Sequence, residues 1–201
     1  MGHRATVRDG LGRPLRRDAR ANQERVLAAA VTAIGRAGPH VAMSSIAAEA
    51  GVGVGTLYRR YPNREALLDA LTVRSFELLL AVFLAAEGRR DTALSSLGWW
   101  WDEVIDHRHQ LILPLGGGRA DLSHEALAVR SDLHDGLRRL LERGQREGSI
   151  RDDVTITDLI LFGAMLVSPL PGASDWTRIA RRQKDIDLDG LAQTRRARLD
   201  H

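Results

Sequence analysis

Apolar residues recur every three to four positions through most of this chain, which is the spacing of one face of an α-helix. No segment shows the strict alternation of apolar and polar residues that marks a half-buried β-strand. Glycine and proline interrupt the pattern repeatedly and divide the chain into helices joined by turns. With 201 residues, 44% of them apolar, the chain can bury a sizeable core. We therefore predict an all-α fold of about nine helices without an internal repeat.

The breaks in the pattern predict three regions: an arginine-rich flexible arm over 1–21, a small helical domain over 22–65 and a larger one over 66–201. The first helix is expected to begin with Asn22 as its N-cap and to end at Gly38-Pro39. Further helices are expected over 43–50, 54–60, 64–87, 91–107, 123–146, 152–168 and 175–199.

Charge is distributed unevenly along the chain. Residues 1–64 hold eleven arginines and four acidic residues, so this third carries +7, whereas the whole chain carries only +3. A basic end on an acidic remainder indicates a polyanionic partner, although a solvated basic tail gives the same pattern. The chain has no cysteine, no apolar stretch long enough for a membrane span and no secretory signal. These features exclude disulfides and thiolate metal sites and lead us to expect a cytoplasmic protein.

Two short predicted helices, 43–50 and 54–60, are joined by Gly51-Val52-Gly53. Ala47 lies four residues before Gly51, which leaves room for a close helix crossing, and Gly51 can supply the left-handed turn residue. This spacing is that of a helix-turn-helix. The second helix then has the right length to enter a DNA major groove.

The residues around this helix-turn-helix make its assignment more specific. Ile46-Ala47, Ala50-Gly51-Val52-Gly53-Val54-Gly55-Thr56-Leu57-Tyr58 and Tyr61-Pro62-Asn63-Arg64-Glu65-Ala66-Leu67 together resemble the DNA-binding domain of the tetracycline-repressor (TetR) family. The resemblance is strong over 22–71. It implies a homodimeric transcriptional regulator, most often a repressor, whose partners are a double-stranded DNA operator, a second copy of the chain and an unidentified small-molecule effector.

The resemblance also implies roles for individual side chains in DNA binding. The candidate contacts are Ser44, Val54, Thr56, Tyr58, Arg59, Arg60 and Arg64. Tyr58 and Arg64 are expected to bind phosphates. Val54 departs from the family pattern, because a polar or charged side chain is frequent at this position, and an exposed valine there can contact a thymine methyl group. Gly53 and Ala42 depart from the family pattern because neither offers the hydroxyl that often caps the following helix.

For the larger domain, the resemblance implies effector binding and dimerisation. The candidate effector contacts are Phe83, Trp100, Trp101, Leu111 and Met165, with Leu113 as a further candidate. The candidate dimer contacts lie in the last two helices and are Leu159, Phe162, Leu166, Trp176 and Ile179. Both sets follow apolar stripes, which also occur in helices that merely pack into the core of one protomer.

No catalytic or metal-binding constellation accompanies these features, and we expect no cofactor. His107 and His109 lie two residues apart next to Asp106, a spacing that points the rings in different directions on a helix. A helical enzyme is therefore the weaker alternative. The stronger one is a TetR-like protein that binds a small molecule or a partner without recognising a specific operator. Activation instead of repression also stays open.

Overall fold

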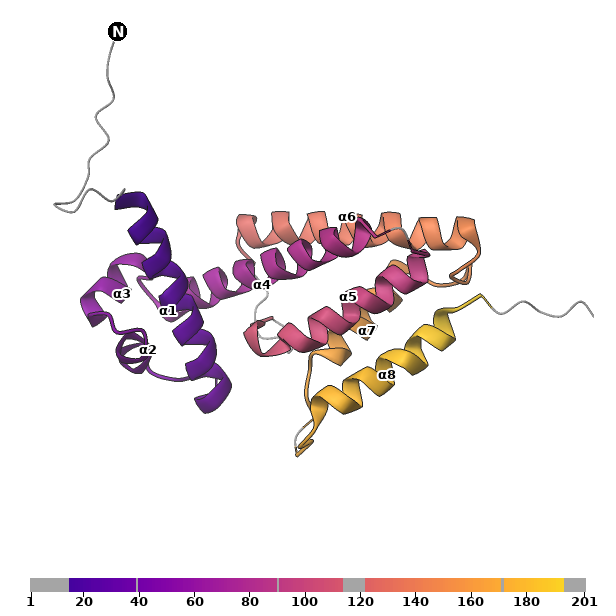
Figure 1. The fold of residues 1–201 in the computed structure, drawn as a ribbon. Helices are drawn as coiled ribbons and strands as arrows, with labels where there is room; N and C mark the ends of the chain where they lie inside the picture. Colours follow the sequence, from indigo (N-terminus) through magenta and orange to yellow (C-terminus); the bar gives the residue numbers. More distant parts are fainter. Residues whose placement is uncertain (1–14, 39, 90, 114–121, 171, 194–201) are drawn as a thin grey trace, which may run out of the picture. The chain divides into compact units, whose positions relative to one another are not determined.

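The computed structural model describes residues 15–38, 40–89, 91–113, 122–170 and 172–193 (Figure 1). Over these residues the chain forms eight α-helices and one short 3₁₀ helix, and none of them lies in a strand. This confirms the predicted all-α class. The chain divides into two compact units, 1–71 and 72–201, and the division falls inside helix α4 (Arg64–Glu87).

The first unit contains α1 (Leu15–Ala37), α2 (Met43–Glu49), α3 (Val54–Arg60) and the start of α4. The prediction that the first helix begins at Asn22 was wrong, because α1 begins seven residues earlier. The sequence between Leu15 and Asn22 contains neither glycine nor proline, so nothing there stops a helix. The side-chain oxygen of Asn22 instead accepts a hydrogen bond from Arg25 at 2.8 Å. The remainder of the predicted arm, residues 1–14, lies outside the described residues.

The core of the first unit is formed where α1, α2 and α3 meet. Its buried apolar side chains are Val26, Leu27, Ala30, Val31, Ala33, Ile34, Met43, Ile46, Ala47, Leu57, Tyr61, Leu67 and Leu71. Gly38 ends α1 in the left-handed conformation, with φ of +83°. Asn63 caps α4, because its side-chain oxygen accepts a hydrogen bond from the Ala66 amide at 2.8 Å.

The second unit continues along α4 and adds α5 (Ala93–His107), the 3₁₀ helix η1 (Arg108–Gln110), α6 (His124–Glu147), α7 (Ile156–Leu166) and α8 (Trp176–Leu191). The last four α-helices begin one to four residues later than predicted, each after a capping side chain. The caps are Thr92, Ser123, Thr155 and Asp175. The predicted extension of the last helix to residue 199 was wrong, because Ala192 is extended and pairs with Ile150 in an isolated bridge.

Helices α4 and α6 run side by side in the second unit (Figure 1) and meet where Phe83 packs against Gly136. A Cβ atom at Gly136 would lie 2.4 Å from Cε1 of Phe83, far inside van der Waals contact. Phe83 is fully buried and meets Trp100 edge to face, with ring centroids 5.8 Å apart. The absence of a side chain at Gly136 therefore allows the two helices to approach.

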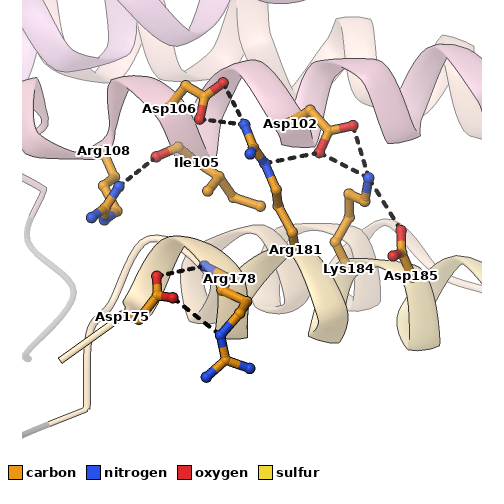
Figure 2. Close-up of polar contacts among 9 residues, drawn as sticks. All are labelled: Asp102, Ile105, Asp106, Arg108, Asp175, Arg178, Arg181, Lys184 and Asp185. Carbon is orange, nitrogen blue, oxygen red and sulfur yellow. Dashed lines mark hydrogen bonds and ion pairs between the residues drawn. The ribbon is translucent and has the colours of Figure 1, made fainter. Parts of the chain in front are cut away.

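Helix α8 is held on α5 by a group of ion pairs (Figure 2). Lys184, the only lysine in the chain, is 9% exposed and donates to both carboxylate oxygens of Asp102 at 2.8 Å. Arg181 donates to both oxygens of Asp106 at 2.7 and 2.9 Å. A buried cation is costly unless it is paired, so the Lys184–Asp102 pair fixes the register of α8 along α5.

Candidate DNA-binding surface and ligand cavity

The turn between α2 and α3 has the geometry of a helix-turn-helix. Gly51 adopts a φ of +64°, which confirms the predicted left-handed turn residue. The amide of Gly51 donates to the carbonyl of Ala48 at 3.1 Å, and that of Val52 to the carbonyl of Ala47 at 3.0 Å. Ala47 is fully buried, so its small side chain lets the two helices pack closely.

Helix α3 is buried on one side and open on the other. Leu57 is its buried anchor, at 1% exposure, whereas Val54 and Tyr58 are 42% and 45% exposed. Arg59 and Arg60 are exposed beside them. Thr56 is half-buried, and its hydroxyl accepts a hydrogen bond from Arg59 at 3.1 Å. An apolar side chain, a phenol and two guanidinium groups thus share the solvent side of a two-turn helix.

Other predicted DNA contacts flank this helix. Ser44 is exposed in the first turn of α2. The guanidinium of Arg60 donates to the side chain of Gln23 on α1. Neither α2 nor α3 has a side-chain cap, because Ala42 and Gly53 occupy the N-cap positions.

Arg64 has a structural contact that sequence reasoning missed. Its guanidinium donates to the carbonyl oxygens of Val41 at 2.6 Å and of His40 at 3.4 Å. The side chain therefore links the start of α4 to the loop between α1 and α2. Nothing in the local pattern signals this contact, because the partners are backbone atoms 23 and 24 residues away.

The second unit contains a cavity of about 290 Å³. It is lined by residues of α4, α5, α6 and α7, together with Leu113 and Val167, which lie outside these helices. The lining residues are Phe76, Leu79, Trp100, Val104, Leu113, Arg130, Leu133, His134, Leu137, Leu159, Ile160, Gly163, Ala164 and Val167. Of these described lining residues, all are apolar or glycine except Arg130 and His134. The indole nitrogen of Trp100 is satisfied by the carbonyl of Leu79 at 3.2 Å, so Trp100 offers the cavity only its ring.

The predicted effector contacts are only partly brought together at this cavity. Trp100 and the further candidate Leu113 line it. Phe83 and Trp101 are fully buried in the core and do not line it, and Leu111 is half-buried outside it. Met165 is 56% exposed on α7. Arg130 and His134 also line the cavity, but they were not predicted, because the prediction considered only apolar residues.

Of the predicted dimer contacts, some are buried inside the protomer and others are exposed. Leu159 and Leu166 are buried inside the protomer, so they cannot supply an exposed surface. Phe162 packs edge to face on Trp101, and the indole of Trp176 donates to the Leu166 carbonyl at 2.8 Å. Ile179 is 37% exposed. The large apolar side chains exposed on α7 and α8 are Leu161, Met165, Ile179 and Ile186.

The described residues also show whether this part of the chain has clustered metal ligands or a helix that could span a membrane. Asp106, the acid next to the histidines 107 and 109, is paired with Arg181. Within the described residues, no three histidine, cysteine or acidic side chains gather as metal ligands. No helix in that same part of the chain is long and apolar enough to cross a membrane.

The chain matches two family models over most of its length. Residues 26–71 match the model for bacterial regulatory proteins of the tetR family, and residues 100–193 match the C-terminal domain of SbtR-like transcriptional regulators. No curated protein sequence matches the chain.

Solved structures with the same fold include several regulators. A TetR transcriptional regulator from Streptomyces coelicolor is 30% identical, has a TM-score of 0.60, and is aligned over 86% of this chain and 99% of its own. A TetR transcription regulatory protein from Mycobacterium vanbaalenii is 28% identical, with a TM-score of 0.60 and coverage of 89% and 99%. The regulator FadR from Bacillus subtilis, solved in complex with stearoyl-CoA, is 18% identical, with a TM-score of 0.65 and coverage of 84% and 99%.

Proposed function

The chain belongs to the TetR family of transcriptional regulators, and from this premise we propose that it is a ligand-responsive repressor that binds a near-palindromic operator as a homodimer. DNA binding itself follows from the family and its helix-turn-helix domain. Regulators of this family are generally not enzymes, and we propose the same of this chain.

The observation that carries the proposal is the open side of α3. Val54, Tyr58, Arg59 and Arg60 are all exposed there, and the helix is anchored behind them by Leu57. We assign base contacts to Val54 and Thr56, because they lie in the first turn of the helix that enters the groove. We assign phosphate contacts to Tyr58, Arg59 and Arg60, with Ser44 on α2 as a further contact.

Arg64 keeps its proposed phosphate contact in addition to its structural one. Hydrogen bonds to neutral backbone carbonyls leave the positive charge of the guanidinium in place. Arg64 also lies at the N-terminal end of α4, where the helix dipole favours an anion.

Dimerisation is proposed through α7 and α8. Leu161 and Met165 lie one turn apart on α7, and Ile179 and Ile186 lie two turns apart on α8. Each of the four side chains is more than a third exposed. A two-fold interface of these helices would cover them, and two-fold symmetry requires operator half-sites about one helical turn, or about 34 Å, apart.

Ligand response is proposed through the cavity and α4. This helix begins directly after the helix-turn-helix, and its residues Phe76 and Leu79 line the cavity. A ligand that binds more tightly to one arrangement of α4 shifts the protein toward that arrangement. Couplings of this kind are typically about 1–3 kcal/mol, equivalent to about 5–150-fold in operator affinity.

The proposal is tested by selecting duplexes that bind the full chain from a random-sequence pool. We expect enrichment of one motif that contains two inverted half-sites. Val54→Ala should change the enriched sequence, because it removes a proposed base contact. A pool that stays random after several rounds would refute operator recognition and favour a TetR-fold protein that binds a small molecule or a partner instead.

A further inference from the structure

The cavity of the second unit has one polar corner. Among the described residues, fourteen line it; twelve of these are apolar or glycine, and the other two are Arg130 and His134. They lie one turn apart on α6, so their side chains emerge from the same face of that helix.

Neither of these side chains has a partner in the described part of the chain. Arg130 and His134 form no hydrogen bond or ion pair there, although most other arginines of the second unit do. Arg138, one turn beyond His134, is paired with Asp135. A partly buried guanidinium is costly without a partner, so the corner is suited to an anion that arrives with a ligand.

The two groups offer complementary donors. Burial lowers the pKa of His134, and the nearby charges of Arg130 and Arg138 lower it further, while Asp135 acts in the opposite direction. His134 is therefore neutral near pH 7 and can donate one hydrogen bond without adding a second charge. Arg130 supplies the fixed charge, and its planar group binds a carboxylate through two parallel hydrogen bonds.

The remainder of the cavity limits the size and polarity of such a ligand. A volume of about 290 Å³ holds about ten non-hydrogen atoms, at about 30 Å³ each as in liquid water. The ring of Trp100 and the apolar side chains of α4 and α7 offer this body no hydrogen bonds. A ligand that fills the space must therefore be apolar except at the end near Arg130.

We propose that this cavity binds a monocarboxylic acid of about ten non-hydrogen atoms, with its carboxylate on Arg130 and His134 and its apolar body against Trp100. The inference rests on the proposed function only for the consequence of binding, which is release of the operator. The binding itself is independent of DNA.

The test is calorimetric titration of the full chain with octanoate and 3-phenylpropanoate, and with the matching alcohols, octan-1-ol and 3-phenylpropan-1-ol. We expect at least one acid to bind about tenfold or more tightly than its alcohol, since hydrogen bonds to charged groups are stronger than neutral ones. Binding of neither acid, or equal binding of each acid and its alcohol, would overturn the proposal.

Variants make the test specific to the corner. Arg130→Gln should weaken binding of the acid about tenfold or more and leave binding of the alcohol unchanged. Arg146→Gln is the matched control, because Arg146 lies on the same helix, does not line the cavity and is not among the charges that act on His134. An Arg130→Gln variant that keeps its thermal transition and its full affinity for the acid would contradict the assignment.

Operator binding, measured without ligand, separates this inference from the proposed function. If the chain binds the acid through Arg130 but selects no DNA motif, the ligand site is supported and the proposed repressor function is refuted. If the chain selects an operator but binds no acid, the repressor function is supported and the proposed ligand site is refuted.

Discussion

The contact between Phe83 and Gly136 predicts a strong effect of the smallest possible substitution. In Gly136→Ala the new Cβ would lie 2.4 Å from Cε1, 3.0 Å from Cδ1 and 3.2 Å from Cζ of Phe83. The ring must move by about 1 Å to restore ordinary carbon contacts of about 3.5–4.0 Å. It is fully buried and confined by Trp100, so we expect the upper part of the overpacking range, about 2–3 kcal/mol. Alanine regains about 1 kcal/mol of helix propensity.

The net expected loss is therefore about 1–2 kcal/mol in the free energy of unfolding, or a fall of about 2–8 °C in Tm. All four tryptophans, 99–101 and 176, lie in the second unit, so their fluorescence during urea titration reports unfolding of that unit. Gly190→Ala is the matched control, because a Cβ there would meet nothing within 4 Å. This control should leave stability unchanged or raise it by up to about 1 kcal/mol.

A double variant separates overpacking from other effects. Leucine at position 83 removes part of the ring, so Phe83→Leu combined with Gly136→Ala should lose less stability than the sum of the two single variants. If Gly136→Ala is as stable as the unchanged chain, Phe83 is not confined, and the proposed reason for the glycine is wrong.

Three further changes test other parts of the molecule. Asp187 is 8% exposed, and burial raises its pKa, so Asp187→Asn should increase the free energy of unfolding at pH 7, measured by urea titration. This increase should vanish as the pH falls through the raised pKa of Asp187 toward the ordinary value of 3.8. An increase that stays the same at every pH would contradict this reasoning. Arg64→Ala should weaken binding to every DNA sequence and lower the salt slope by about 1; an unchanged slope counts against a phosphate contact. Met165→Asp should weaken dimer affinity about tenfold or more, measured by sedimentation, whereas Leu84→Asp, equally exposed on α4, should not weaken it. A Met165→Asp variant with unchanged dimer affinity would exclude the exposed face of α7 as the dimer interface.

The sequence was sufficient where local chemistry decides the structure. Gly51 was predicted as a left-handed turn residue and Gly38 as the end of the first helix. Both glycines adopt the left-handed conformation, because few other residues do so at low cost. The bounds of α3 and α4 agree with the prediction, since Pro62-Asn63 separates them and Asn63 caps the second. Breaks and caps of this kind depend on residues within a few positions of one another.

The sequence was insufficient where distant segments decide the outcome. A stripe such as Leu159, Phe162 and Leu166 shows that one face is apolar, but not whether a neighbouring helix or a second protomer covers it. In the structure Leu159 and Leu166 serve the protomer's own core, and the exposed residues are Leu161 and Met165. The pairing of Lys184 with Asp102 spans 82 positions and has no local signal. Arg130 and His134 have the spacing of an ordinary solvated helix face, so their position in a cavity depends on the packing of other helices.

The most direct test of the account is the equilibrium affinity of the full chain for the duplex enriched by selection, measured by fluorescence anisotropy over a series of salt concentrations. A scrambled duplex of the same length and composition is the control. We predict that the enriched duplex binds about 10³-fold or more tightly than the control at physiological salt, and that both affinities fall as salt increases. Equal affinity for the two duplexes at every salt concentration would contradict the claim that this chain is an operator-specific regulator.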